Sequence, residues 1–117
     1  MVLPTNLKHL ATAAELTKLI NENENVMVCA GRMGPMCLPV YDVMKTLEDS
    51  GQYAHVKFRD MLFDNPETAI IRNLPECRSF MGIPFVVYYK NGKVVKATSS
   101  VQRMDTVKSI LNSEFAK

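Results

Sequence analysis

The stretch MGIPFVVYYKNGKVV, residues 81–95, determines how the second half of the chain folds. It opens with a Gly-Ile-Pro segment and continues into the apolar run Phe85–Tyr89. A Lys-Asn-Gly turn follows, and a second extended segment, Lys93–Ser99, comes directly after it. Two such runs joined by an Asn-Gly turn are the strongest short-range signal for a β-hairpin. We therefore predict a pair of antiparallel strands here.

Three further strands are predicted before this hairpin. They lie at Leu7–Leu10, Val26–Ala30 and Ala54–Met61. The segment Val26–Ala30 is apolar throughout, which is typical of a strand covered on both faces. The segment Ala54–Met61 alternates, with Val56 and Phe58 on one face.

Helices are predicted between these strands and after the hairpin. Proline is tolerated only near the first turn of a helix, so Pro39 places the start of the second helix around Pro35 to Cys37. The other three helices are indicated by the capping-box spacing of Thr12 and Glu15, by Asp64 or Asn65 ahead of Pro66, and by the helical spacing of Met104, Val107, Ile110, Leu111 and Phe115.

The predicted order is β-α-β-α-β-α-β-β-α, which indicates an α/β fold. Strands that alternate with helices run parallel, and the hairpin adds antiparallel strands to the same sheet. We therefore expect a central mixed β-sheet with helices on both faces. A length of 117 residues suits one domain with a modest core, spanning residues 1–117.

Composition narrows the range of partners. The net charge is only +2 and the basic residues are scattered, so we expect no nucleic-acid partner. No apolar segment approaches the roughly 18–20 residues that span a membrane, and the N-terminus lacks the apolar stretch of a signal peptide. We therefore predict a cytoplasmic protein with no membrane partner. The absence of a phosphate-binding glycine loop and of paired His/Glu spacing predicts no cofactor.

These motifs resemble the thioredoxin family over most of the chain. Residues 81–95 are similar to the family's Gly-Ile-Pro-Thr segment with its following strand and turn. The stretch VMVCAGRMGPMC, residues 26–37, is similar to the family's strand and Ala-x-Trp-Cys-Gly-Pro-Cys motif. DNPE, residues 64–67, is similar to the segment that opens the family's third helix, and PVYDVM, residues 39–44, is similar to the family's helix after the active site, with its proline.

The resemblance implies a thioredoxin fold with a cis peptide bond before Pro84. It also implies that Pro84 faces the active-site loop. In the family, the backbone before this proline pairs with an extended segment of the partner, a form of β-strand addition. Ile83 would supply that backbone in this chain.

The active-site stretch GRMGPMC, residues 31–37, departs from the family pattern. Met33 and Met36 stand where the family has its two cysteines, with Gly34 and Pro35 kept between them. A thioether has no proton to lose, so it cannot attack a disulfide. Further departures are Arg32 and Cys29 at tryptophan positions, Met27 at a buried aspartate and Ser100 at a glycine. The family's dithiol mechanism therefore cannot be transferred.

Three cysteines remain as candidates for thiol chemistry: Cys29, Cys37 and Cys77. Cys37 falls in the first turn of the second helix, where free N–H groups and the helix dipole favour a thiolate. Arg32 would add positive charge, although Cys37 could equally be a small apolar residue packed on the sheet. Cys77 precedes Pro84 by seven residues and could pair with Cys37 if its loop packs nearby. Cys29 is typical of an inert buried cysteine, and it is the alternative partner for Cys37.

Methionines raise the question of a soft metal site. Met27, Met33, Met36 and Met81 could gather with Cys29 and Cys37 around Cu(I). No histidine lies near them in the sequence, and methionine is usually core filler. We therefore predict no metal.

Two functional hypotheses follow. In the first, Cys37 attacks a disulfide of a protein substrate, Cys77 resolves the mixed disulfide, and a thioredoxin-reductase-type enzyme restores the thiols. Substrate contacts would come from Arg32, Met33, Gly34, Pro35, Met36, Ile83 and Pro84. In the second, the chain is a redox-inactive binding module that holds a protein partner with the Pro84 groove and the Met33/Met36 surface.

Overall fold

A computed structural model describes residues 2–79 and 82–116 of the chain. The elements follow the predicted order, with two short 3₁₀ turns added around the third helix. The strands are β1 (Lys8–Leu10), β2 (Asn25–Gly31), β3 (Lys57–Leu62), β4 (Phe85–Lys90) and β5 (Lys93–Ser99). The helices are α1 (Ala13–Glu22), α2 (Leu38–Asp49), α3 (Ala69–Arg72) and α4 (Met104–Glu114), and the 3₁₀ turns are η1 (Pro66–Thr68) and η2 (Pro75–Cys77).

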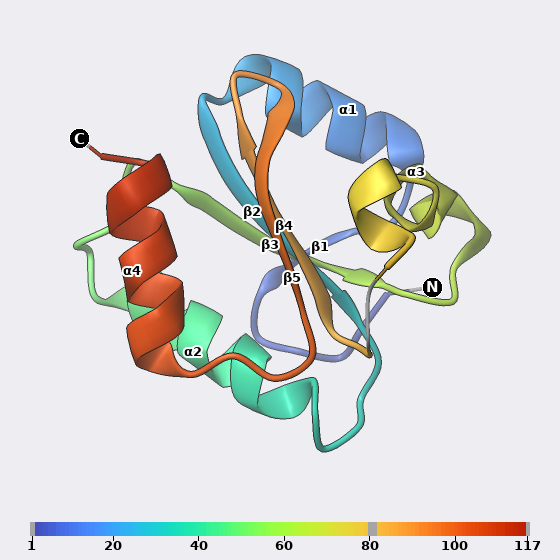
Figure 1. The fold of residues 1–117 in the computed structure, drawn as a ribbon, viewed down its shortest axis with the longest axis horizontal. Coiled ribbons are helices and arrows are strands. Elements are labelled where there is room, and N and C mark those ends of the chain that lie inside the picture. Colours follow the sequence, from blue (N-terminus) through green and yellow to red (C-terminus); the bar gives the residue numbers. More distant parts are fainter. Residues whose placement is uncertain (1, 80–81, 117) are drawn as a thin grey trace.

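The five strands form one mixed sheet in the order β1-β3-β2-β4-β5 (Figure 1). Strands β1, β3 and β2 are parallel, β4 runs antiparallel to β2, and β5 runs antiparallel to β4. The predicted mixed sheet and terminal hairpin are therefore confirmed. All seven residues of β2 are buried, as its continuous apolar pattern predicts for the central strand.

Helices cover both faces of the sheet, as predicted (Figure 1). We call the core between the sheet and helices α2 and α4 the α2/α4 core, and the core on the other face the α1/α3 core. Because side chains alternate along a strand, Met27 and Cys29 of β2 enter the α2/α4 core, whereas Val26, Val28 and Ala30 enter the α1/α3 core. Odd-numbered residues 27 and 29 of β2 therefore face the α2/α4 core, and even-numbered residues 26, 28 and 30 face the α1/α3 core.

Helix starts follow the signals in the sequence. The Thr12 side chain accepts a hydrogen bond from the N–H of Glu15, whose carboxylate accepts one from the Thr12 N–H, so the predicted capping box is present. Helix α2 begins at Leu38 with Cys37 as its N-cap and Pro39 in its first turn. Asn65 caps η1 through a hydrogen bond that its side chain accepts from the Glu67 N–H. Local sequence thus fixes where α2 starts relative to the end of β2.

None of the helices among residues 2–79 and 82–116 is long and apolar enough to cross a membrane.

Candidate functional site

Three separate parts of the chain meet at Gly31, the last residue of β2. A β-carbon placed on Gly31 would lie 2.5 Å from Oη of Tyr41, 2.9 Å from Sγ of Cys37 and 3.3 Å from Cβ of Pro84. The first two distances are shorter than a real Cβ contact, so only glycine fits here without movement of a neighbour. The candidate site is built around this point, where β2, the start of α2 and the segment before β4 converge.

The backbone of Arg32 is held on both sides by residues of the α2 region. Its N–H donates a hydrogen bond to Sγ of Cys37 at 3.3 Å. Its carbonyl oxygen accepts a hydrogen bond from the hydroxyl of Tyr41 at 2.9 Å. Further along the loop, the Gly34 carbonyl oxygen accepts from the N–H groups of Cys37 and Leu38, each at 3.1 Å. The loop between β2 and α2 is therefore anchored at both ends.

The side chain of Arg32 binds Asp64, which follows β3. Nε and Nη2 of Arg32 donate to the two carboxylate oxygens of Asp64 at 2.6 and 2.8 Å. The guanidinium also lies over the ring of Phe63, with 5.9 Å from Cζ to the ring centroid. Asp64 is the main cause of the raised pKa of Arg32, and Arg32 in turn lowers the pKa of Asp64. Arg32 therefore contacts Cys37 through its backbone N–H, while its guanidinium is bound to Asp64.

Exposed apolar side chains gather around this loop. Met33 and Met36 are each 44% exposed, and Leu38 is 40% exposed. Val101, which follows β5, is 42% exposed, and the neighbouring Ser100 donates its N–H to the Gly82 carbonyl oxygen at 3.2 Å. We call Met33, Met36, Leu38 and Val101 the Met33/Met36 patch. The loop before α2, the start of β4 and the end of β5 lie at the same end of the sheet (Figure 1).

The segment Gly82–Pro84 borders this patch. The peptide bond between Ile83 and Pro84 is cis. Ile83 is half-buried and packs against both cores, whereas Pro84 is buried and lies against Gly31. This is the arrangement that the resemblance implied for Pro84 and the loop before α2.

A cavity of about 340 Å³ adjoins the patch. It lies between the N-terminal segment around Thr5 and helix α2, with Met33 and Leu38 on its rim and Tyr41 in its wall. Asp42 and Lys45 of α2 supply polar groups to the same wall. The patch therefore continues into a hollow that mixes apolar and polar lining.

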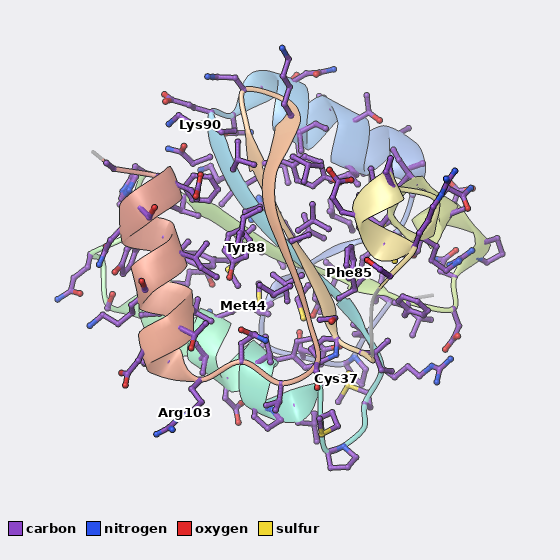
Figure 2. The ribbon with its side chains drawn as sticks, viewed as in Figure 1. Cys37, Met44, Phe85, Tyr88, Lys90 and Arg103 are labelled. Carbon is purple, nitrogen blue, oxygen red and sulfur yellow. The ribbon has the colours of Figure 1, made fainter. Side chains whose placement is uncertain are left out.

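All three cysteines are free and buried. Cys29 and Cys37, 0% and 1% exposed, belong to the α2/α4 core, and Cys77, 3% exposed, belongs to the α1/α3 core. Cys37 lies at the end of the sheet nearest the start of α2, and its sulfur points inward (Figure 2). The structure thus brings Cys29 and Cys37 into one layer and separates both from Cys77. A Cys37–Cys77 disulfide stays a prediction, and it would require the η2 turn to leave its packing.

Burial also changes the pKa of Cys29 and of Cys77, the two predicted disulfide partners of Cys37. It raises the pKa of Cys29 strongly, with smaller contributions from the charges of Cys37 and Asp60. It also raises the pKa of Cys77, and the charge of Arg72 opposes this shift. Neither of these thiols is set up to ionise readily on its own.

Sequence reasoning missed a buried carboxylate beside Cys29. Asp60 of β3 is fully buried and pairs in register with Cys29 of β2. Its two carboxylate oxygens face the hydroxyl of Thr5 and Nδ1 of His9, the latter at 2.7 Å. Burial raises the pKa of Asp60, and the hydrogen bonds from Thr5 and His9 oppose that shift. A single acidic residue inside the strand pattern FRDM was the only sequence signal for it.

Tyr41 was also missed, although its spacing offered a signal. It follows Cys37 by four residues, one helical turn further along α2, so both side chains face the sheet. Burial raises the pKa of Tyr41, and the charges of Cys29, Cys37 and Asp60 contribute further. Tyr41 therefore stays protonated and acts as a hydrogen-bond donor to the loop.

The soft ligands considered for copper are not gathered at one point. Met27 is fully buried in the α2/α4 core, whereas Met33 and Met36 are exposed, and Met81 lies outside the described residues. Within the described part of the chain, no group of three or more His, Cys, Asp or Glu residues could hold a metal ion.

Several solved structures similar to this one are thioredoxins. Thioredoxin from Plasmodium falciparum has a TM-score of 0.72 at 21% identity, over 92% of this chain and 99% of that one. Malassezia sympodialis thioredoxin (Mala s 13) has a TM-score of 0.77 at 13% identity, over 99% of this chain and 96% of that one. The N21Q mutant thioredoxin from Halobacterium salinarum has a TM-score of 0.72 at 20% identity, over 97% of this chain and 94% of that one.

No protein-family model and no curated protein matches the sequence. The structural matches cover nearly the whole chain and establish that it has the thioredoxin fold, as the sequence resemblance implied.

Proposed function

We propose that this chain is a thioredoxin-fold binding module that holds an extended segment of a protein partner on the Met33/Met36 patch. The observation that carries the proposal is a contrast in exposure at the candidate site. The thioethers of Met33 and Met36 are each 44% exposed, whereas Cys37 is 1% exposed. At this site the protein offers adaptable apolar contact area to a partner, and it withholds the thiol.

The side chains of the patch suit a polypeptide partner. Methionine is unbranched and polarizable, so its side chain adjusts to irregular apolar surfaces. Leu38 and Val101 are further exposed apolar side chains of the patch, and the adjoining cavity beside Met33 has room for a partner side chain. An extended segment would lie beside Ile83 and add its backbone hydrogen bonds to these side-chain contacts.

The anchored loop supports the same proposal. Tyr41 and Cys37 hold the backbone of Arg32, and Asp64 holds its side chain, so the loop that carries Met33 and Met36 is already ordered. A surface that is ordered before binding loses less conformational entropy when a partner arrives. These contacts thus give the buried cysteine and the exposed ion pair a role in shaping the surface.

Peptide selection tests this proposal. Extended peptides would be selected by phage display on the wild-type protein, and their affinities measured by fluorescence anisotropy. The double variant Met33→Ser/Met36→Ser should weaken binding at least about tenfold, the effect of roughly 1.4 kcal/mol. The matched control is Val95→Ser, because Val95 is 38% exposed on β5 outside the patch. A serine hydroxyl at position 37 can still accept the Arg32 N–H, so a variant with all three cysteines changed to serine that unfolds cooperatively should still bind, and loss of binding by this folded variant would contradict the proposal.

Thiol chemistry at Cys37 is a second candidate, favoured by one observation. Sγ of Cys37 lies at the N-terminus of α2, accepts a hydrogen bond from the Arg32 N–H at 3.3 Å and adjoins Gly31 beside Pro84. In this candidate Cys37 attacks protein disulfides, and a thioredoxin-reductase-type enzyme reduces it afterwards. The test is the rate at which Cys37 reacts with iodoacetamide at neutral pH. A rate as slow as that of Cys77 would rule the candidate out.

A further inference from the structure

We propose that Cys29 and Cys37 form an internal disulfide when the protein meets a small peroxide. This inference concerns the thiol layer beneath the Met33/Met36 patch and does not depend on partner binding. It assigns Cys37 a different partner from Cys77, which the sequence analysis had favoured. Cys29 and Cys37 share the α2/α4 core, and Gly31 leaves space beside the Cys37 sulfur.

Gly31 lies near both cysteines, Cys29 and Cys37. Cys29 and Gly31 are two residues apart on β2, so their side-chain positions lie on the same face, about 6.6 Å apart along the strand. Sγ of Cys37 lies 2.9 Å from the point where Gly31 would carry a β-carbon. The sulfur of Cys37 and the hydroxyl of Tyr41 therefore share the side-chain position next to that of Cys29. Any larger residue than glycine would have separated them.

The surroundings allow Cys37 to turn toward Cys29. Both residues belong to the α2/α4 core, and Cys29 and Gly31 share one face of β2. Cys37 is the N-cap of α2 and makes no side-chain cap hydrogen bond, so rotation of its side chain gives up its contacts with the Arg32 N–H and with the Tyr41 hydroxyl. A disulfide requires Cα atoms about 4.4–6.8 Å apart, so the first turn of α2 must bring Cys37 within that distance of Cys29 when the bond forms.

Burial determines the kind of oxidant. Cys37 is 1% exposed, so a protein disulfide cannot approach it without opening the loop, whereas hydrogen peroxide is little larger than water. Peroxide converts the Cys37 thiol to a sulfenic acid and releases one water. The Cys29 sulfur then attacks the sulfenic sulfur, the S–S bond forms, the S–O bond breaks, and the hydroxyl leaves as water with the Cys29 proton. Two thiols and one peroxide thus give one disulfide and two waters.

Trypsin mapping tests the inference without any variant. Arg32 separates the two cysteines, so trypsin places Cys29 in the peptide 19–32, Cys37 in 33–45 and Cys77 in 73–78. The folded full-length chain would be treated with hydrogen peroxide, alkylated in denaturant and digested. We expect peptides 19–32 and 33–45 joined, with the loss of two hydrogen atoms, and peptide 73–78 alkylated. Reduction with dithiothreitol should separate the joined peptides.

Cysteine variants provide a second test of the Cys29–Cys37 disulfide. Cys77→Ser should form the same crosslink to the same extent, because Cys77 lies in the other core. Cys37→Ser should leave Cys29 alkylated after the same treatment. A link between 33–45 and 73–78 would overturn the inference in favour of the Cys37–Cys77 pair. Alkylation of all three cysteines in the oxidised wild type, or overoxidation of Cys37 with no crosslink, would overturn it as well.

Discussion

The hydroxyl of Tyr41 donates a hydrogen bond to the carbonyl oxygen of Arg32 over 2.9 Å. This single hydrogen bond connects helix α2 to the loop that carries Met33 and Met36. The hydroxyl can form it because burial keeps the pKa of Tyr41 raised and the group protonated. The hydrogen bond therefore connects the position of the loop to that of the helix, and the consequences can be measured.

Removal of this hydroxyl should loosen the loop. We expect Tyr41→Phe to lower the free energy of unfolding by about 0.5–1.5 kcal/mol, the net value of one hydrogen bond. It should also speed the alkylation of Cys37 and weaken binding of the selected peptides. The control is Tyr53→Phe, which removes a hydrogen bond to Asn112 of the same length, 2.9 Å, away from the loop. Equal alkylation rates of Cys37 in the two variants would contradict this role of Tyr41.

Gly31 and Gly34 should respond in opposite ways to alanine. At Gly31 the added methyl group meets Tyr41, Cys37 and Pro84, so Gly31→Ala should lower stability by about 1–3 kcal/mol, as overpacking does. At Gly34 nothing lies within 4 Å of the added carbon, so Gly34→Ala should leave stability nearly unchanged. Urea unfolding of both variants measures this difference. Similar losses in both would show that space around Gly31 is not limiting.

Ser100 has a left-handed backbone, with φ at 70°. A residue with a branched β-carbon is poorly tolerated in this region, so Ser100→Val should lower stability by about 1–2 kcal/mol. Ser100→Gly is the matched control, and it should keep or slightly raise the free energy of unfolding because glycine adopts this conformation freely. Thermal unfolding of the two variants decides the matter: if valine is tolerated as well as glycine, the backbone at this position is not restrictive.

Asp60 should make stability depend on pH in an unusual direction. Burial raises its pKa in the folded protein despite the hydrogen bonds from Thr5 and His9. A raised folded pKa means that the folded state holds the proton more tightly, so this contribution to stability is complete below the unfolded pKa of about 3.9. It is lost as the pH rises through the folded pKa. The stability of the wild type relative to Asp60→Asn should therefore fall as the pH is raised from about 4.

Urea unfolding of both proteins across that pH range provides the measurement. Because Nδ1 of His9 contacts the same carboxyl group, His9→Gln should be measured in parallel as a control for that contact. A stability difference between wild type and Asp60→Asn that stays constant with pH would show that Asp60 ionises normally.

Local chemistry made much of the fold predictable. The Asn-Gly turn produced the β4–β5 hairpin with its second strand at the predicted Lys93–Ser99, and Pro39 set the start of α2 within one residue. The capping box of Thr12 and Glu15 likewise appears as predicted. Each of these features depends on residues a few positions apart, so the sequence carries the whole signal.

Features that depend on the packing of distant segments could not be predicted. The contact of His9 with Asp60 spans 51 residues, and that of Arg32 with Asp64 spans 32. The position of Cys77 was unpredictable for a related reason. The helix α3 has only four residues, and the chain after it packs as the η2 turn into the α1/α3 core. Nothing local indicated which face of the sheet this turn would cover.

The sheet separates Cys77 from Cys29 and Cys37, so the cysteines can report local opening of each core separately. A reagent that labels Cys77 registers openings of one layer, and labelling of Cys29 or Cys37 registers openings of the other. Timed labelling of the natural chain, without any attached dye, would therefore reveal whether the two halves of the interior open together or independently.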